Sequence, residues 1–126
     1  MTIRRILVAD DSPASRSLVA SALSDVAGVE IARVSSGVEA VKLVATDSFD
    51  LVLTDINMPD INGLELLRFI KTSERLRALP VLVISTAAAE ADRARALSLG
   101  AEGYLAKPFT ADQLRQAIEQ VFNTGQ

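Results

Sequence analysis

The sequence contains no cysteine, no histidine and no tryptophan. Without cysteine the chain can form neither disulfide bonds nor thiolate metal sites. Without histidine it lacks the usual ligand of transition metals and the base of serine and cysteine hydrolases. These two absences remove the commonest metal and nucleophile chemistries and leave carboxylates, hydroxyls and amines as the groups available for a site.

Long apolar runs and a strong basic charge are also missing. The longest apolar run is far too short to cross a membrane. Arg5 leads directly into the run Ile6-Leu7-Val8-Ala9, and no cleavable secretory signal is visible. The net charge is −3, which argues against non-specific nucleic-acid binding. We therefore expect a cytoplasmic protein with no membrane segment and no nucleic-acid partner.

Regular alternation of two kinds of segment is what the chain does have. With 126 residues and no linker or repeat, residues 1–126 are expected to form one domain. Short apolar runs predict strands at residues 6–9, 29–34, 51–53, 81–84 and 104–106. Amphipathic segments predict helices from Ser12-Pro13 to Gly28, at residues 38–45, 64–71 and 89–99, and after a capping box at Thr110 and Gln113.

Five strand–helix units indicate an α/β fold with a parallel sheet. The first, third and fourth strands are continuously apolar and should be central, with both faces covered. The second strand alternates and the fifth is short, so both suit the edges. With right-handed crossovers these constraints favour the strand order 2-1-3-4-5, a common order for doubly wound sheets.

Polar side chains follow the carboxyl ends of these strands, where ligands bind in such sheets. They are Asp10 and Asp11 after the first strand, Asp55 after the third, Ser85 after the fourth and Lys107 after the fifth. Three neighbouring carboxylates repel one another and attract a hard cation, for which Mg²⁺ is the best candidate. A carboxylate nucleophile beside a metal and a lysine is typical of phosphoryl transfer.

Four motifs in order give a specific resemblance. The chain resembles the receiver domain of two-component response regulators, most of all the single-domain chemotaxis type, over residues 4 to 122. The motifs are Val8-Ala9-Asp10-Asp11-Ser12, Asp55-Ile56-Asn57-Met58-Pro59-Asp60-Ile61-Asn62-Gly63, Pro80-Val81-Leu82-Val83-Ile84-Ser85 and Gly100-Ala101-Glu102-Gly103-Tyr104-Leu105-Ala106-Lys107-Pro108-Phe109. Two departures are minor: Ser85 stands where threonine is commoner, and Asn62 where aspartate is common.

The resemblance implies a flavodoxin-like (βα)5 three-layer sandwich and a role for each site residue. Asp55 is the phosphoryl acceptor. Asp11, Asp55 and the carbonyl of Asn57 ligate Mg²⁺ directly, and Asp10 acts through a metal-bound water. Lys107 contacts the phosphoryl group.

A second set of roles implied by the resemblance concerns signalling. Ser85 binds a phosphoryl oxygen in the active state, and Tyr104 is its aromatic switch partner. Asn57 and Ala87 flank the path of hydrolytic water and tune the phosphoryl lifetime. The Lys107-Pro108 bond is expected to be cis.

The implied partners are a histidine kinase or a histidine phosphotransfer protein as phosphodonor and a downstream protein. The downstream protein would bind the face formed by the fourth helix, fifth strand and fifth helix. The domain would catalyse only its own phosphorylation and dephosphorylation and would not be an enzyme in the ordinary sense.

Other interpretations stay open at this point. Each site residue alone has an ordinary explanation, such as an acid at a helix start, a surface lysine or a half-buried tyrosine at a sheet edge. The chain could also be a fragment of a regulator with a DNA-binding or enzymatic output domain, or a receiver-like scaffold that takes no phosphate. A haloacid-dehalogenase phosphohydrolase is less favoured, because Asn57 stands where a second aspartate is usual. A dinucleotide-binding domain lacks its glycine-rich fingerprint here.

Overall fold

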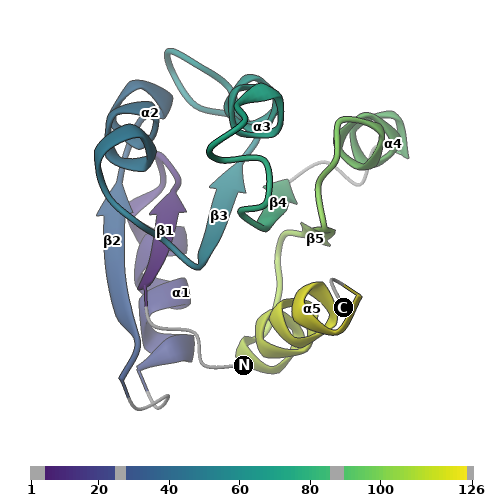
Figure 1. The fold of residues 1–126 in the computed structure, drawn as a ribbon. Helices are drawn as coiled ribbons and strands as arrows, with labels where there is room; N and C mark the ends of the chain where they lie inside the picture. The colour runs from purple at the N-terminus through teal and green to yellow at the C-terminus, as the bar shows by residue number, and fades with distance from the viewer. Residues whose placement is uncertain (1–4, 25–27, 86–89, 125–126) are drawn as a thin grey trace.

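The computed structural model describes residues 5–24, 28–85 and 90–124. Over these residues five strands alternate with five helices (Figure 1). The strands are β1 (Arg5–Ala9), β2 (Glu30–Val34), β3 (Leu51–Asp55), β4 (Val81–Ser85) and β5 (Gly103–Ala106). The helices are α1 (Pro13–Leu23), α2 (Gly37–Thr46), α3 (Gly63–Thr72), α4 (Glu90–Ser98) and α5 (Ala111–Thr124).

The strands form one parallel sheet in the order β2-β1-β3-β4-β5, which confirms the predicted order. All residues of the central strands β3 and β4 are buried, while β2 at one edge is buried only at Val34. The continuous apolar runs of the central strands therefore have the expected cause, which is coverage of both faces by helices.

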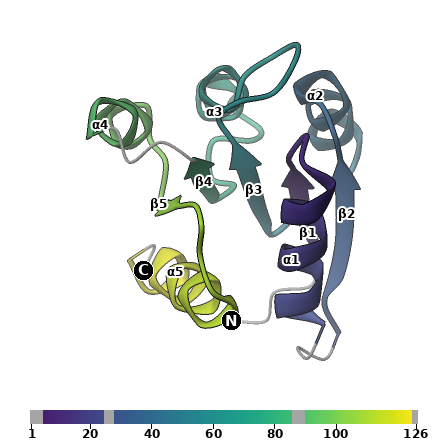
Figure 2. The same cartoon turned by 180° about the vertical axis from the view of Figure 1, so that it is seen from behind.

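Two separate cores lie on the two faces of the sheet. One face packs against α2, α3 and α4, whose inward residues include Val44, Leu66 and Ala96. The opposite face packs against α1 and α5 through residues such as Val19 and Leu114. Figures 1 and 2 show these helices on opposite sides of the strands. Each fully buried leucine or valine contributes about 1.5–3 kcal/mol, so the three layers hold one another in place.

The predicted starts of α1 and α5 are confirmed. Ser12 caps α1, with Pro13 as its first residue. At α5 the hydroxyl of Thr110 accepts the N–H of Gln113, whose side chain in turn accepts the N–H of Thr110. Reciprocal bonds of this kind satisfy N–H groups that have no partner inside the helix.

The predicted boundaries differ from the structure by one residue at most elements, and the differences at α1, β3 and β4 have identifiable causes. Helix α1 ends at Leu23 instead of continuing to Gly28, which lies in a turn with φ +83°. Strands β3 and β4 are longer than predicted, because backbone pairing continues through the Asp55↔Ile84 and Ser85↔Ala106 pairs. Asp55 and Ser85 are therefore the last residues of their strands. The polar side chains led the sequence argument to end both strands too early.

Two expectations fall outside the part of the chain that the structure describes. These are the start of the fourth helix at residue 89 and the role of Ala87. Among the described helices, none has both the length and the apolar character needed to cross a membrane.

Candidate functional site

Three aspartates meet at the carboxyl edge of the sheet. Asp10 and Asp11 directly follow β1, and Asp55 ends the adjacent strand β3. One carboxylate oxygen from each lies within 4.8 Å of the others. Asp10 and Asp55 are only 2% and 4% exposed, whereas Asp11 is exposed. The sequence prediction that strand ends bring these residues together is confirmed as geometry.

Lys107 supplies a positive charge to the two buried aspartates. Its Nζ donates to Oδ2 of Asp10 at 2.8 Å and to Oδ2 of Asp55 at 3.2 Å. Its backbone N–H donates to the carbonyl of Ser85 at 2.7 Å, which extends the β4–β5 pairing by one residue. The Lys107–Pro108 peptide is cis, as expected from the resemblance. Two of the three carboxylates therefore pair with the ammonium of Lys107, and the cluster keeps a negative excess.

Burial and the neighbouring charges shift the pKa values of Asp55 and Lys107. Burial raises the pKa of Asp55 above its ordinary value, the charge of Lys107 lowers it, and the charge of Asp10 raises it again, with a net increase. For Lys107, burial lowers the pKa, but the hydrogen bond and charge of Asp10 and the charge of Asp55 raise it overall. A cation that bound here would relieve the same repulsion that now opposes ionisation of Asp55.

The carboxylates of Asp10 and Asp11 differ in how far they are hydrogen-bonded. Asp10 accepts the backbone N–H of Ser12 at Oδ1 and the ammonium of Lys107 at Oδ2, so both of its oxygens are engaged. Among the described residues, the carboxylate of Asp11 has no hydrogen-bond or ion-pair partner. Asp11 is therefore the carboxylate most available to an incoming ligand.

The loop after β3 passes close to the acidic cluster. Asn57 has an exposed side chain, and its N–H donates to Oδ1 of Asp55 at 3.4 Å. The loop closes where the N–H of Gly63 donates to the carbonyl of Ile56 at 2.9 Å. A Cβ at Gly63 would overlap the carbonyl oxygen of Asp55, so only glycine allows this approach.

Asp60 fastens the same loop to the start of α2. Its carboxylate accepts the N–H groups of Gly37 at 2.9 Å and of Val38 at 3.1 Å, and also that of Ile61 at 2.7 Å. The backbone hydrogen bond from Ile61 is the largest cause of the lowered pKa of Asp60. Sequence reasoning treated Asp60 only as part of a turn, because its partners at the start of α2 lie far away in the chain.

Ser85 lies on β4, and Tyr104 lies on the neighbouring strand β5. Ser85 is fully buried at the end of β4. Tyr104 is half-buried, pairs with Val83 across the β4–β5 ladder and packs against the core beneath α2, α3 and α4. Val83 and Ser85 are two residues apart, so they project from the same face of the sheet.

The comparison with known families agrees with this arrangement. The family model for the response regulator receiver domain matches residues 6–119. The chain belongs to this family. The receiver domain is 36% identical over 118 residues to the chemotaxis protein CheY of Pseudomonas aeruginosa, covering 94% of this chain and 95% of that protein. It is 34% identical over 121 residues to CheY1 of Helicobacter pylori, covering 95% and 98%.

Solved structures extend the likeness to the backbone. The structure of the chemotaxis response regulator CheY4 of Vibrio cholerae superposes on this receiver domain with a TM-score of 0.87 at 29% identity. It covers 95% of this chain and 99% of the other. The flavodoxin-like (βα)5 fold is therefore shown, and the chain is a module of two-component signalling, a family of signalling proteins and not of ordinary enzymes.

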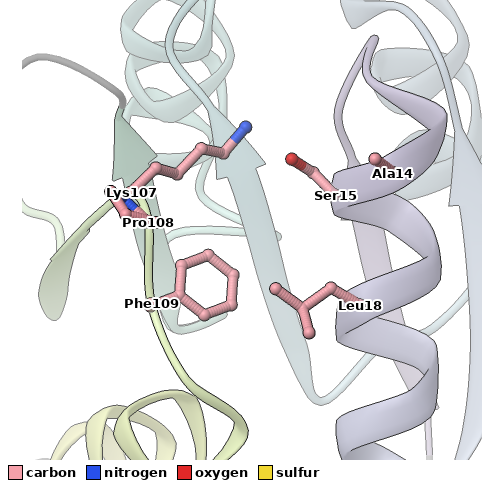
Figure 3. Close-up of a pocket in the computed structure, with 6 residues that line it drawn as sticks. All are labelled: Ala14, Ser15, Leu18, Lys107, Pro108 and Phe109. Atoms are coloured by element: carbon pink, nitrogen blue, oxygen red, sulfur yellow. The ribbon is translucent and has the colours of Figure 1, made fainter.

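A pocket that sequence reasoning missed adjoins the site of this receiver domain. It has a volume of about 420 Å³ and lies between α1 and the segment that follows β5 (Figure 3). Most of its surface is apolar, and Phe109 faces Leu18 across it, while the side chains of Lys107 and Ser15 point toward each other at one end. The lining residues are Ala14, Ser15, Leu18, Lys107, Pro108 and Phe109. The two walls are distant in sequence, so no local pattern signals the pocket.

Proposed function

We propose that this receiver domain accepts a phosphoryl group on Asp55 in a Mg²⁺-dependent reaction and thereby switches a protein-binding surface. The observation that carries the proposal is the cluster of three carboxylates within 4.8 Å of one another, with the ammonium of Lys107 bonded to Asp10 and Asp55. A negative cluster of this kind suits a divalent cation, and the nearby ammonium suits a phosphoryl oxygen.

The donor set fits Mg²⁺, which prefers oxygen ligands and keeps several waters. Asp11, Asp55 and the carbonyl of Asn57 would hold the ion directly, and Asp10 would act through a bound water. When bound, the ion supplies positive charge to the oxygens of the transferring group. The exposure of Asp11 and the engagement of both oxygens of Asp10 support this division of roles.

Asp55 would act as the nucleophile. A carboxylate oxygen of Asp55 forms a bond to phosphorus while the bond from phosphorus to a donor nitrogen breaks, and the nitrogen leaves with the electron pair. The chain contains no histidine, so a donor histidine belongs to a partner kinase or phosphotransfer protein. Lys107 neutralises charge on a phosphoryl oxygen, and its proximity also favours the ionised form of Asp55 that attacks.

Two surfaces are candidates for the partners. The apolar pocket beside Lys107 lies next to the nucleophile and suits a phosphodonor that must bring its own histidine to Asp55. The face of α4, β5 and α5 contains Tyr104 and suits a target that reads the phosphorylated state. The relatives are named as chemotaxis proteins, so chemotaxis is the first pathway to test. An output domain elsewhere in a longer protein would use the same switch.

The test is intact-mass spectrometry after treatment with acetyl phosphate and Mg²⁺. Wild type should gain one phosphoryl group, and omission of Mg²⁺ or the substitution Asp55→Asn should abolish the gain. Asp50→Asn is the matched control, because Asp50 lies at the opposite end of the sheet. Labelling of Asp55→Asn at the wild-type rate would refute Asp55 as acceptor, and failure of wild type to label would favour a scaffold without phosphate chemistry.

A further inference from the structure

We infer that Arg16 is a positioning residue for the Mg²⁺ site and acts through the peptide group that joins Asp10 to Asp11. The inference rests on the proposed function, because it concerns affinity for Mg²⁺. It assigns to Arg16 an effect opposite to the one that its positive charge alone would have.

The contact comes from the first turns of α1. The backbone N–H of Arg16 donates to the carbonyl of Ser12 at 3.0 Å, which begins the helix. The half-buried side chain reaches back over the start of the helix, and its Nη1 donates to the carbonyl oxygen of Asp10 at 2.6 Å. A hydrogen bond from a charged guanidinium is short and strong compared with a neutral one.

Asp10 has other fixed contacts, and the bond from Arg16 completes them. The backbone N–H of Asp10 donates to the carbonyl of Val34 at 3.1 Å, one residue beyond the end of β1. Its two carboxylate oxygens accept Ser12 N–H and Lys107 Nζ. The carbonyl of Asp10 lies past the end of the strand, and in the described part of the chain the guanidinium of Arg16 is the group that bonds it.

The orientation of that carbonyl determines where the Asp11 side chain begins. A peptide group is planar, so the carbonyl of Asp10, the N–H of Asp11 and the Cα of Asp11 lie in one plane. The carboxylate of Asp11 is exposed and has no partner among the described residues, so no side-chain contact there holds it. Its direction therefore depends on the backbone that Arg16 holds.

Charge and positioning predict opposite results when Arg16 is replaced. A positive charge beside a cation site repels the cation, so by Coulomb's law its removal should tighten Mg²⁺ binding. A group that orients a metal ligand has the reverse effect, since loss of such outer contacts typically weakens metal affinity by about 10–100-fold. The sign of the change therefore separates the two roles.

The chain offers a matched control for the chemistry of the contact. Arg115 also donates through Nη1 to a backbone carbonyl, that of Ala22 in α1, at 3.1 Å. This bond lies near the end of α1, whereas Arg16 lies near its start. Arg115→Met removes the same kind of bond and the same charge as Arg16→Met, together with an exposed ion pair to Asp112, at a place where no metal ligand is held.

The experiment is a calorimetric titration with Mg²⁺ of wild type, Arg16→Met and Arg115→Met, each checked for folding by circular dichroism. We expect about tenfold weaker affinity for Arg16→Met and wild-type affinity for Arg115→Met. Equal or tighter binding by Arg16→Met overturns the inference, as does an equal loss in Arg115→Met. If Arg16→Met does not fold, the shorter and uncharged Arg16→Gln replaces it, with the same expected loss and the same refuting result.

The wild-type titration separates this inference from the proposed function. A wild-type protein that binds no Mg²⁺ refutes the metal-dependent function and the inference together. A wild-type protein that binds Mg²⁺ and labels on Asp55, combined with an Arg16→Met variant of undiminished affinity, refutes only the role of Arg16.

Discussion

Charged side chains are paired differently at the two ends of the sheet. At the amino ends of the strands, carboxylates meet N–H groups and cations. Asp50 accepts the N–H of Arg5 at 3.0 Å, and Glu102 accepts the N–H of Val81 at 2.9 Å and the ammonium of Lys71 at 2.8 Å. Lys71 also donates to two backbone carbonyls of the segment before β4. The charged groups at this end of the sheet therefore have hydrogen-bond partners within the protein.

At the carboxyl ends of the strands, negative charges outnumber the positive charge that pairs with them. Asp10 and Asp55 share the ammonium of Lys107, Asp11 lies beside them without a partner among the described residues, and burial raises the pKa of Asp55. Repulsion among these groups opposes folding, whereas the matched groups at the other end support it. The contrast indicates that one end of the sheet serves stability, and that the other gives up stability for the capacity to bind a cation and an anion.

Replacing one lysine at each end tests this division most directly. Lys107→Met should slow labelling of Asp55 by acetyl phosphate by about 100-fold, because a donor aimed at the developing charge is lost. Lys71→Met should leave labelling unchanged and lower the free energy of unfolding by about 2 kcal/mol, because Glu102 and two carbonyls lose their donor. Mass spectrometry gives the first quantity and urea unfolding the second.

The test depends on each substitution changing only one of the two quantities, the labelling rate for Lys107→Met and the free energy of unfolding for Lys71→Met. If Lys71→Met slowed labelling as much as Lys107→Met, the two ends would not be independent. If Lys71→Met had no effect on unfolding, its contacts at the amino end would not contribute to stability.

Within the carboxyl end, the two adjacent aspartates should differ. Asp11→Ala should weaken Mg²⁺ binding by about tenfold or more, and Asp10→Ala by less. The reason is that Asp11 has no partner among the described residues, whereas Asp10 is bonded to Ser12 and Lys107. Calorimetric titration measures the order, with Asp50→Ala as a control from the amino end. The reverse order would contradict the assignment of Asp11 as the direct ligand.

The position of the acidic cluster could be predicted from sequence because it depends on few variables. Apolar runs locate strands, and parallel strands place their last residues on one edge, so Asp10, Asp55 and Lys107 had to meet. The same reasoning ended β3 and β4 early, since it took Asp55 and Ser85 as loop residues.

The contacts that hold the loops could not be predicted in this way. Asp60 reaches Gly37, Arg75 reaches the carbonyls of Val44 and Ala45, and Arg115 reaches Ala22. Each joins residues far apart in sequence and depends on how the helices lie against one another. Long side chains on exposed faces follow no periodicity that would reveal their partners.

A smaller effect is expected for the route by which phosphorylation is read. Ser85 should move to bond a phosphoryl oxygen, since a charged acceptor is the better partner, and Tyr104 should turn into the space that it leaves. The coupling between the two events should be about 1–3 kcal/mol. Tyr104 is the single tyrosine in a chain without tryptophan, so its fluorescence or NMR signal reports on one site.

The measurement compares wild type, Ser85→Ala and Ser85→Thr with and without beryllofluoride, a phosphoryl mimic. The Tyr104 signal should respond in wild type and in Ser85→Thr, which keeps the hydroxyl, and less in Ser85→Ala. An equal response in Ser85→Ala would show that the signal reaches Tyr104 by another route.

The smallest expected effect concerns the stability that the carboxyl end gives up. The folded protein raises the pKa of Asp55 above the ordinary value of 3.8, so the folded state holds a proton there more tightly than the unfolded chain does. As pH rises from 3.8 through the raised pKa, the unfolded state loses this proton first. The contribution of Asp55 to stability therefore falls over that window and stays unfavourable at neutral pH.

Asp55→Asn removes this penalty. Without Mg²⁺, the variant should unfold a few degrees above wild type at neutral pH, and the difference should shrink as pH falls below the raised pKa, where wild-type Asp55 is neutral too. Asp60 is the contrasting group, because folding lowers its pKa. Its ionised carboxylate therefore stabilises the fold at pH values above its pKa in the unfolded chain, and this stability is lost as pH falls through its pKa in the folded protein. Thermal unfolding of wild type, Asp55→Asn and Asp60→Asn across this pH range checks both signs. A wild type more stable than Asp55→Asn at neutral pH would show that Lys107 fully compensates the burial of Asp55, and that the carboxyl end carries no net cost.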